Sequence, residues 1–531
     1  AFLDSQYRLL QRSESVSAGQ ISDMNLKGDT ENVTPARPTP EEPARSRFAQ
    51  VSTYAQDQRS PWPALWSMML GFFMILVDST IVAVAIPAIA GSLDASYNEV
   101  IWVNSAYLLA YAVPLLITGR LGDRFGPRKL YLTGLALFSV SSLVCGMAGA
   151  VGSVGVLIAA RAFQGLGGAM LSPQTMSVMI RTFAPNERGT AMGLWGGTAG
   201  VATVAGPLLG GFLVDLGGWE WIFYVNVPVG IIGLILAWKH VPRLELTARS
   251  FDWLGVALSA AGMFCLIFGI QEGANFNWDI RVVGLIATGA VLLVAFVWWQ
   301  TRTSRDALVP LSLFDDKNFA LASLTIATVG FAVSTFTIPW MIYVQSVKVL
   351  TPTQAALLIL PSGVVSGALS GFIGKLTNTR DPKPIVITGL SVTALSMVAA
   401  AGITQPSISS AWMLLISVFY GLGNSMMWGP LSMIATRNLD PRLAGAGSSV
   451  YNTVRQVGAV IGSASVAAMM SAQLAARVGD GDSTFAGPLP EPLHEPFATA
   501  MAATILLPAG VLAAGAALAL FFNKTRTWND N

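Results

Sequence analysis

Long apolar stretches, separated by short polar segments, follow one another from about residue 66 to near the end of the chain. Each is close to the roughly 20 residues that a helix needs to cross the hydrocarbon core of a bilayer. The pattern therefore predicts an all-α polytopic membrane protein with fourteen transmembrane helices. We expect these helices near residues 66–89, 100–119, 130–149, 154–180, 189–213, 221–239, 253–271, 281–299, 318–344, 353–374, 384–403, 411–436, 444–472 and 498–522.

The polar segments between these stretches alternate in charge. Lys and Arg are concentrated in the loops that follow the even-numbered helices, whereas the other loops contain only Arg281, Lys348 and Arg477. Because basic loops stay on the cytoplasmic side, the alternation favours an even number of spans with both termini in the cytoplasm. We expect a multi-pass protein of the plasma (inner) membrane.

The chain also repeats itself. Pro87 and Pro339 are 252 residues apart, and so are Gly119 and Gly371. The repeat leaves two helices between the halves, which indicates a 6+2+6 arrangement. Repeated halves in one membrane chain are typical of secondary transporters, with the substrate site near the midplane between the halves.

These observations predict five regions. The Ser-, Pro- and Glu-rich start of the chain lacks sustained apolar periodicity and is expected to be a disordered cytoplasmic tail. The regions are the tail at 1–60, an N-terminal six-helix bundle at 61–250, an inserted two-helix hairpin at 251–305, a C-terminal six-helix bundle at 306–524 and a cytoplasmic C-terminal tail at 525–531.

Composition narrows the possible functions. Apolar residues make up 53% of the chain and charged residues 11%, against about 25% charged in soluble domains, so a soluble protein is excluded. The net charge of +2 is dispersed over loops and gives no support for nucleic-acid binding. Cys145 and Cys265 lie in apolar stretches, and His240 and His494 lie in loops on opposite sides. No metal site or catalytic cluster is therefore predicted, and an intramembrane enzyme or a receptor is a remote alternative.

Three ionisable residues lie deep within predicted helices: Asp78, Arg161 and Arg455. A charge there costs at least about 2.5 kcal/mol on insertion scales, so it is generally paired or functional. Burial favours a neutral carboxyl and a nearby cation an ionised one, a competition that would let Asp78 exchange a proton. A structural aspartate is the alternative. Arg161 would modulate Asp78 or clamp the bundle, and Arg455, beside Asn452 and Gln456, would contact substrate or act as a clamp.

Aromatic and polar side chains within the spans are candidates for a substrate cavity. Aromatic rings bind flat lipophilic compounds, cations included, although in membrane proteins they also gather at lipid-facing and interfacial positions. Acidic groups are few in the spans, which argues against a narrow site for a polar nutrient. The candidates are Trp195, Phe223, Trp340, Tyr343, Trp412, Trp428, Tyr451, Asn452, Arg455 and Gln456.

Glycines and one proline are concentrated in the stretch GLWGGTAGVATVAGPLLGG, at Gly193, Gly206, Pro207, Gly210 and Gly211. Glycine lets helices approach closely, and proline removes one backbone hydrogen bond, so this helix can bend. The stretch is either a moving hinge or a passive packing face.

Four motifs together resemble the major facilitator superfamily, specifically its fourteen-span drug:H+ antiporter family, over about residues 64–525. VDSTIVAVAIP is similar to the first-helix signature, LIAARAFQGLGGA to the fourth-helix signature, and the glycine-rich stretch to the fifth-helix antiporter signature, with Ala202 where glycine is usual. GRLGDRFGPRK is similar to the signature of the loop between the second and third helices, at Gly119, Leu121, Asp123, Arg124, Gly126, Arg128 and Lys129.

The resemblance implies a major facilitator fold with pseudo-symmetric halves. It further implies export of lipophilic, often cationic drugs or toxic compounds by alternating access, driven by the proton gradient without a cofactor. Asp78 would be the main proton-exchange site, and Arg161 its modulator. Gly119, Asp123, Arg124, Gly126 and Arg128 would form a cytoplasmic latch. The expected partners are lipophilic or cationic small molecules, protons and membrane lipids, with no nucleic acid and no specified accessory protein; a specific endogenous lipid or metabolite is the alternative cargo.

Overall fold

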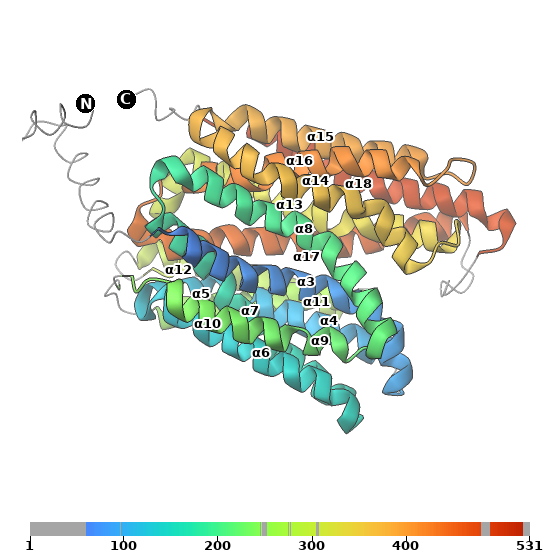
Figure 1. The fold of residues 1–531 in the computed structure, drawn as a ribbon, viewed down its shortest axis with the longest axis horizontal. Helices are drawn as coiled ribbons and strands as arrows, with labels where there is room; N and C mark the ends of the chain where they lie inside the picture. The colour runs from blue at the N-terminus through green and yellow to red at the C-terminus, as the bar shows by residue number, and fades with distance from the viewer. Residues whose placement is uncertain are drawn as a thin grey trace, which may run out of the picture. The chain divides into compact units, whose positions relative to one another are not determined.

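The computed structural model describes residues 60–523, apart from residues 96, 245, 247–251, 274–275, 277, 304–306 and 479–488. The predicted tails lie outside the described residues, except for Ser60. Every regular element in the described part is helical (Figure 1). The helices are α3 (Trp62–Ser92), α4 (Tyr97–Ala112), α5 (Leu115–Phe125), α6 (Pro127–Val151), α7 (Val154–Thr182), α8 (Pro185–Gly217), α9 (Trp221–Tyr224), α10 (Asn226–His240), α11 (Trp253–Glu272), α12 (Ile280–Arg302), α13 (Lys317–Ser346), α14 (Pro352–Thr379), α15 (Pro382–Ile403), α16 (Trp412–Thr436), α17 (Ala444–Arg477) and α18 (His494–Ala519), with short 3-10 turns at Leu311–Asp315, Pro441–Leu443 and Glu491–Leu493.

Each of the fourteen predicted stretches contains one helix or one broken helix. Within the described residues, eleven helices are long and apolar enough to cross a membrane. Two bent pairs of helices also qualify if each pair is counted as one span, which brings the number to thirteen. The remaining stretch is α16, which has 25 residues but falls short of that apolar measure. Its polar Asn424 and Ser425 are buried, since α16 packs against α14 and α15.

Proline and acidic residues define where helices begin and break. Pro127 starts α6, and the side chains of Asp316 and Asp381 cap α13 and α15. The second predicted span is not one straight helix, because α4 and α5 meet at an angle of 47°. Pro114 lies at this break, where its ring and missing N–H interrupt the helical hydrogen bonds.

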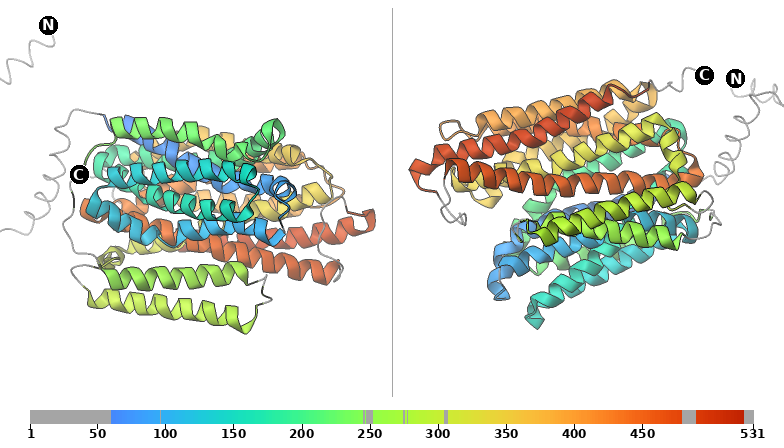
Figure 2. Two further views of the ribbon diagram at one scale, coloured as in Figure 1. Left: turned by 90° about the horizontal axis from the view of Figure 1, so that it is seen from below. Right: turned by 180° about the vertical axis from the view of Figure 1, so that it is seen from behind.

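The helices form two groups and a hairpin. The first group is α3–α10 and the second is α13–α18. Most helices pack mainly within their own group, whereas α8 and α14 pack most extensively on each other. We keep the predicted 6+2+6 division as a proposal and call these groups the first and second halves. The halves meet through α8 against α14 and α16, and through α17 against α5 and α7. They converge at the end where α5 finishes and α17 begins, and they diverge toward the opposite end (Figures 1 and 2).

The inserted hairpin lies along one side of the molecule (Figure 2, left). Its helices α11 and α12 pack together, and α11 also contacts α4 and α17, one helix from each half. Buried Asp252 ties the base of the hairpin together. Its carboxylate accepts hydrogen bonds from Trp299 Nε1 at 2.9 Å and Gln300 Nε2 at 2.8 Å.

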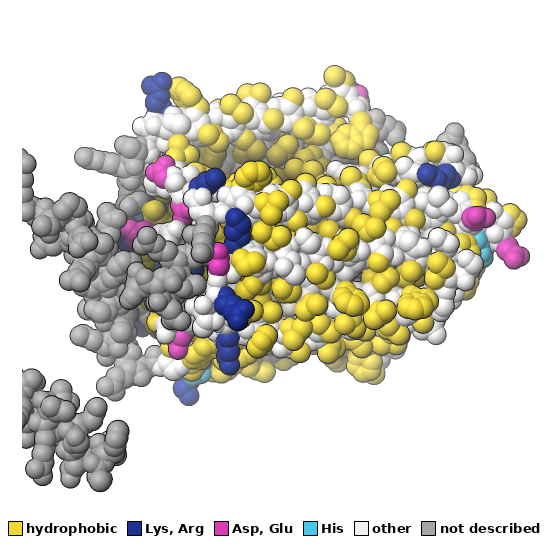
Figure 3. Space-filling view, turned by 90° about the horizontal axis from the view of Figure 1, so that it is seen from above, with side chains coloured by type: hydrophobic (Ala, Val, Ile, Leu, Met, Phe, Trp, Pro, Cys, Tyr) yellow, Lys and Arg dark blue, Asp and Glu magenta, His cyan; other side chains and the backbone are white. Residues whose placement is uncertain are grey.

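The surface of the described part agrees with a membrane environment. A broad band of apolar side chains covers the face in Figure 3, and Lys and Arg side chains gather toward one end of that band. Large apolar side chains are exposed on the described helices, among them Phe212, Ile235 and Val294. Exposed apolar surface on this scale matches lipid rather than water, so the chain is a multi-pass membrane protein.

Candidate functional site

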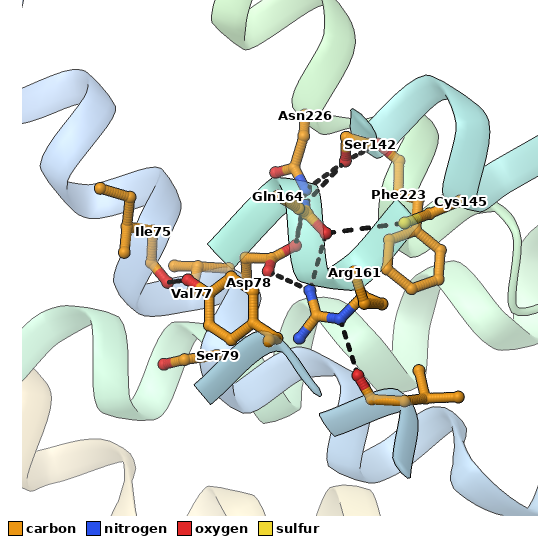
Figure 4. Close-up of polar contacts among 12 residues, drawn as sticks. Ile75, Val77, Asp78, Ser79, Ser142, Cys145, Arg161, Gln164, Phe223 and Asn226 are labelled. Atoms are coloured by element: carbon orange, nitrogen blue, oxygen red, sulfur yellow. Dashed lines mark hydrogen bonds and ion pairs between the residues drawn. The ribbon is translucent and has the colours of Figure 1, made fainter. Parts of the chain in front are cut away.

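Asp78 lies halfway along α3 and is completely buried. Its Oδ2 accepts a hydrogen bond from Nη1 of Arg161 on α7, also fully buried, at 2.5 Å. Its Oδ1 accepts from Gln164 Nε2 at 2.9 Å and from Asn226 Nδ2 at 3.0 Å (Figure 4). The structure therefore brings together the two residues predicted for proton coupling and surrounds the carboxylate with three donor groups.

Arg161 is fixed by partners on α4 and α7 as well as by Asp78. Its Nε donates to the carbonyl oxygen of Val103 at 3.2 Å, and its Nη1 also donates to Gln164 Oε1 at 2.8 Å. The ring of Tyr107 lies 4.0 Å from the guanidinium carbon, a cation–π contact. Nη2 has no hydrogen-bond partner among the described residues. The guanidinium thus keeps one free donor beside a carboxylate.

Ser142 on α6 links the remaining members. Its hydroxyl oxygen accepts from Gln164 Nε2 at 3.1 Å and from Asn226 Nδ2 at 3.0 Å, and it donates to the carbonyl oxygen of Phe223 at 3.1 Å. Cys145 Sγ lies 3.7 Å from Gln164 Oε1. One polar network consequently joins α3, α4, α6, α7, α9 and α10 inside the first half.

This network can respond to a single proton. Protonating Asp78 would remove the negative charge that compensates Arg161, and it would turn one acceptor oxygen into a donor. A proton on Oδ2 would leave Arg161 Nη1 facing a donor, and a proton on Oδ1 would do the same to Gln164 and Asn226. The displaced donors would have to find other acceptors, because buried polar groups are costly when unpaired. Protonation of Asp78 would therefore be linked to the arrangement of the helices that carry these side chains.

Most of the predicted aromatic residues are buried rather than lipid-facing. Trp195, Phe223, Trp340 and Tyr451 are at most 2% exposed, and among the candidates only Trp412 has a large exposure, 57%. The lipid-facing alternative is therefore wrong for most of them, because neighbouring helices cover their rings.

These aromatic residues do not form one cluster in the structure. Phe223 belongs to the Asp78 network, with its ring 5.8 Å from the guanidinium carbon of Arg161. The ring of Trp195 on α8 stacks on that of Phe72 on α3, with 4.9 Å between the ring centroids. The ring centroids of Trp340 and Tyr343, both on α13, are 5.8 Å apart. Their joint role in a substrate cavity stays a prediction.

The other predicted cavity residues lie on α16 and α17. Trp428 Nε1 donates to Asn424 Oδ1 at 3.0 Å, and the Tyr451 hydroxyl accepts from Ser432 at 3.2 Å. Asn452 is fully buried and Gln456 nearly so, while Arg455 is half-buried. These side chains lie in the second half, away from the Asp78 network.

The predicted latch joins the two halves at two of its five positions. Asp123 is buried at the end of α5, and its carboxylate accepts from the backbone amides of Gly445 and Ala446 in the first turn of α17. A negative charge is stabilised at a helix N-terminus. A Cβ at Gly119 would lie 2.7 Å from the Cβ of Ser449, so only glycine allows this approach of α5 and α17.

The other three latch residues have different surroundings. Gly126, at φ 95°, is the single residue between α5 and α6, where a loop of several residues was expected. Arg124 is exposed beside Phe125, and Arg128 donates to the carbonyl oxygen of Trp238, which holds α6 to α10. Arg120 was not among the predicted latch residues. Its Nη2 donates to the carbonyl oxygen of Ala307 at 2.6 Å, in the segment after the hairpin.

Gly119→Val is expected to open this end of the molecule and lower transport about tenfold or more. The added side chain overlaps Ser449, and overpacking of a close contact costs about 1–3 kcal/mol, equivalent to a five- to 150-fold shift between conformations. The distance between spin labels at the ends of α5 and α17 measures the shift. Gly284→Val, where a Cβ meets nothing within 4 Å, is the matched control. Unchanged label distances in Gly119→Val would contradict the latch.

The predicted hinge residues lie along α8, which bends by 40° between Pro185–Ala202 and Val204–Gly217. Gly206 is the one that touches the Asp78 helix, because a Cβ there would lie 3.2 Å from the carbonyl oxygen of Val77 and overlap the Thr80 side chain. At the other end of α8, a Cβ at Gly193 would lie 2.7 Å from Gly374 of the second half. The remaining hinge positions are buried Gly210, half-buried Pro207, and Gly211 near Thr353.

Sequence reasoning found the charged pair but not its polar partners. Gln164 follows Arg161 by three positions, which places both side chains on one helix face. Asn226 could have been predicted as a partner, because a polar amide inside a predicted span usually has a partner there. Ser142 and Tyr107 carry no such signal, since serine and tyrosine are ordinary in membrane helices.

Comparison with known proteins identifies the class of this chain. The family model of the Major Facilitator Superfamily matches residues 68–463, so the chain belongs to that superfamily. An MFS-type transporter of Mycobacterium tuberculosis is 48% identical over 472 residues, covering 87% of this chain and 81% of the relative. The tetracenomycin C resistance and export protein of Streptomyces glaucescens is 33% identical, covering 79% and 77%.

Solved structures support the same fold. The proton:xylose symporter XylE superposes with a TM-score of 0.60 at 13% sequence identity, over 88% of this chain and 96% of the symporter. The predicted major facilitator fold is confirmed. The relatives also support the prediction, made from the motifs, that the chain belongs to the drug-exporting branch of the superfamily.

Proposed function

We propose that this transporter exports lipophilic, drug-like molecules in exchange for protons, by alternating access of a site between its two halves. The observation that carries the proposal is the fully buried Asp78–Arg161 pair, whose carboxylate also accepts from the amides of Gln164 and Asn226. A buried carboxylate in the middle of a membrane helix is costly, and a role in proton transfer explains its presence. The export direction is supported by the relative named as a resistance and export protein.

The proposal includes a location and a direction. The protein would lie in the plasma (inner) membrane with both termini in the cytoplasm, because Lys and Arg gather at the end that bears the latch. In the described conformation the halves meet at that end, so the site would face outward and take up a proton from outside. Closing the opposite end and opening the latch would then release the proton inside as substrate binds.

A specific endogenous lipid or metabolite is the second candidate cargo. It is favoured by a shallow, open groove of about 350 Å³ between α3, α8 and α14. Its lining is mainly apolar and includes Trp66, Phe73, Leu194 and Val201. Such a groove suits the entry of an acyl chain from the bilayer.

Efflux from energised cells tests the proposed function. Cells that express the chain are loaded with ethidium, a neutral polycyclic antibiotic or a fluorescent lysolipid, with and without a protonophore. We expect efflux of at least one of the two drugs to exceed that of cells with empty vector and to stop with the protonophore. Gradient-dependent loss of the lysolipid alone would favour the second candidate. Efflux of any compound that ignores the protonophore would contradict proton coupling.

A further inference from the structure

Arg455 lies where the two halves meet. It is on α17, which packs against α5 and α7 of the first half and against α13 of the second; Figure 1 shows α17 between the two groups. Ser448, two turns earlier on α17, donates to the carbonyl oxygen of Pro173 on α7 at 3.1 Å. Arg455 is therefore a cation on the helix that borders the space between the halves.

Gly330 makes room for this arginine. It lies 252 positions after Asp78, which is the spacing of the internal repeat, so it is the counterpart of Asp78 in the second half. A Cβ at Gly330 would lie 3.3 Å from Cγ of Arg455 and would overlap the arginine's carbonyl oxygen. The first half thus has an aspartate at this repeat position, whereas the second half has a glycine, and Arg455 packs against that glycine.

The two membrane arginines differ in their partners. Arg161 has a carboxylate, an amide oxygen, a carbonyl oxygen and an aromatic ring. The side chain of Arg455 has no hydrogen bond or ion pair with any described residue, and the structure leaves it half-buried. A guanidinium cannot lose its proton, so inside a membrane protein it requires an acceptor.

Neighbouring polar atoms on α17 are also unpaired. Asn452 Oδ1 and Thr453 Oγ1 are buried without a partner among the described residues, although Asn452 Nδ2 donates to the carbonyl oxygen of Ser448. Asn452 lies three positions before Arg455 and so shares its helix face, whereas Thr453 is two positions away and faces elsewhere. A buried amide oxygen without a partner on the face that carries the free guanidinium indicates a surface shaped for a polar group that is not part of the described protein.

Charge decides which polar group fits. Among the described residues, Asp78, Arg161 and Arg455 are the ionisable side chains well inside the spanning helices. With Asp78 ionised, the first two cancel and Arg455 leaves an excess of one positive charge. A monoanion would neutralise it, whereas a cationic substrate would add a second positive charge in a region of low dielectric.

We propose that Arg455 is an anion-recognition residue and that the preferred substrates are lipophilic organic acids, whose carboxylate pairs with the guanidinium. The inference rests on the proposed function and narrows its substrate class, since the sequence alone pointed to aromatic compounds with cations included. Asn452 Oδ1 would accept a hydrogen bond from a hydroxyl or N–H elsewhere on the bound molecule, since a carboxylate itself has no donor.

Three probes with one ring system test the inference. Anthracene-9-carboxylate, 9-anthracenemethanol and 9-anthracenemethylammonium differ in charge but little in shape, and their binding to the purified full-length protein is followed by fluorescence anisotropy. We expect the Kd of the carboxylate to be at least about tenfold lower than that of the alcohol. A hydrogen bond to a charged group contributes about 1.5–3 kcal/mol, and about 1.4 kcal/mol corresponds to a tenfold change in Kd. The ammonium should bind most weakly.

Two variants assign the preference to Arg455. Arg455→Gln is expected to bring the carboxylate affinity down to that of the alcohol, and Arg455→Lys to keep the order of the three probes. Arg281→Gln, at an arginine that is 92% exposed, is the matched control and should bind as wild type does. Thermal unfolding of each variant shows whether it is folded.

Several outcomes would overturn the inference. A wild-type protein that binds the alcohol or the ammonium as tightly as the carboxylate has no anion preference. An equal loss for all three probes in a folded Arg455→Gln would make Arg455 a structural clamp. Both results leave the proposed function standing, because that function is tested separately by protonophore-sensitive efflux.

Discussion

Asp78→Asn is expected to abolish uphill export while leaving the exchange of substrate for substrate intact. Asparagine keeps the shape and one acceptor oxygen, but it cannot take up and release the proton. A proton crossing 100 mV supplies about 2.3 kcal/mol, and about 1.4 kcal/mol corresponds to a tenfold ratio. For a neutral substrate exchanged one-for-one with protons, wild-type proteoliposomes under such a potential should therefore concentrate substrate up to about 50-fold, whereas Asp78→Asn should reach no accumulation.

Substrate exchange is the internal control for this variant. It needs binding and alternating access but no net proton movement, so its survival shows that Asp78→Asn is folded and mobile. Asp215→Asn, the same change at an exposed position on α8, should accumulate substrate as wild type does. Full accumulation by Asp78→Asn would move the proton site elsewhere.

Arg161→Ala is expected to lower the free energy of unfolding by about 3–5 kcal/mol. The substitution leaves Asp78 buried without its cation, and breaking a buried ion pair from one side has a cost of that size. It also removes the hydrogen bond to Val103 and the contact with Tyr107. Steric trapping in bicelles measures the change.

A double variant separates charge from packing. Asp78→Asn combined with Arg161→Gln removes both charges, so we expect it to recover part of the stability that Arg161→Ala loses. Arg281→Ala, at an exposed arginine, should unfold as wild type does. A loss below about 1 kcal/mol for Arg161→Ala would show that the pair contributes little to the fold.

The helices were predictable because a membrane imposes length and polarity on every span. Basic loops fixed the even number of spans, and the 252-residue repeat indicated two related halves. The break at Pro114 was missed because an apolar stretch gives no bend angle, although the proline marked the place. The single-residue connection at Gly126 was missed for a similar reason, since charged residues there looked like a loop.

The site was predictable only for its charges. Asp78 and Arg161 stand out against apolar neighbours, but their pairing across 83 positions depends on how α3 and α7 pack. The aromatic residues illustrate the limit more clearly. Hydropathy cannot say whether Trp195 or Trp340 faces lipid or a neighbouring helix, and the structure buries both.

Substrate-driven proton movement tests the central claim most directly. Proteoliposomes containing wild type or Asp78→Asn enclose a pH-sensitive dye, and a gradient is imposed of a compound that wild type exports in the efflux assay. Our account predicts that the gradient drives protons in the opposite direction through wild type and drives none through Asp78→Asn. Substrate movement through wild type without any change of internal pH, or equal proton movement through both proteins, would contradict it.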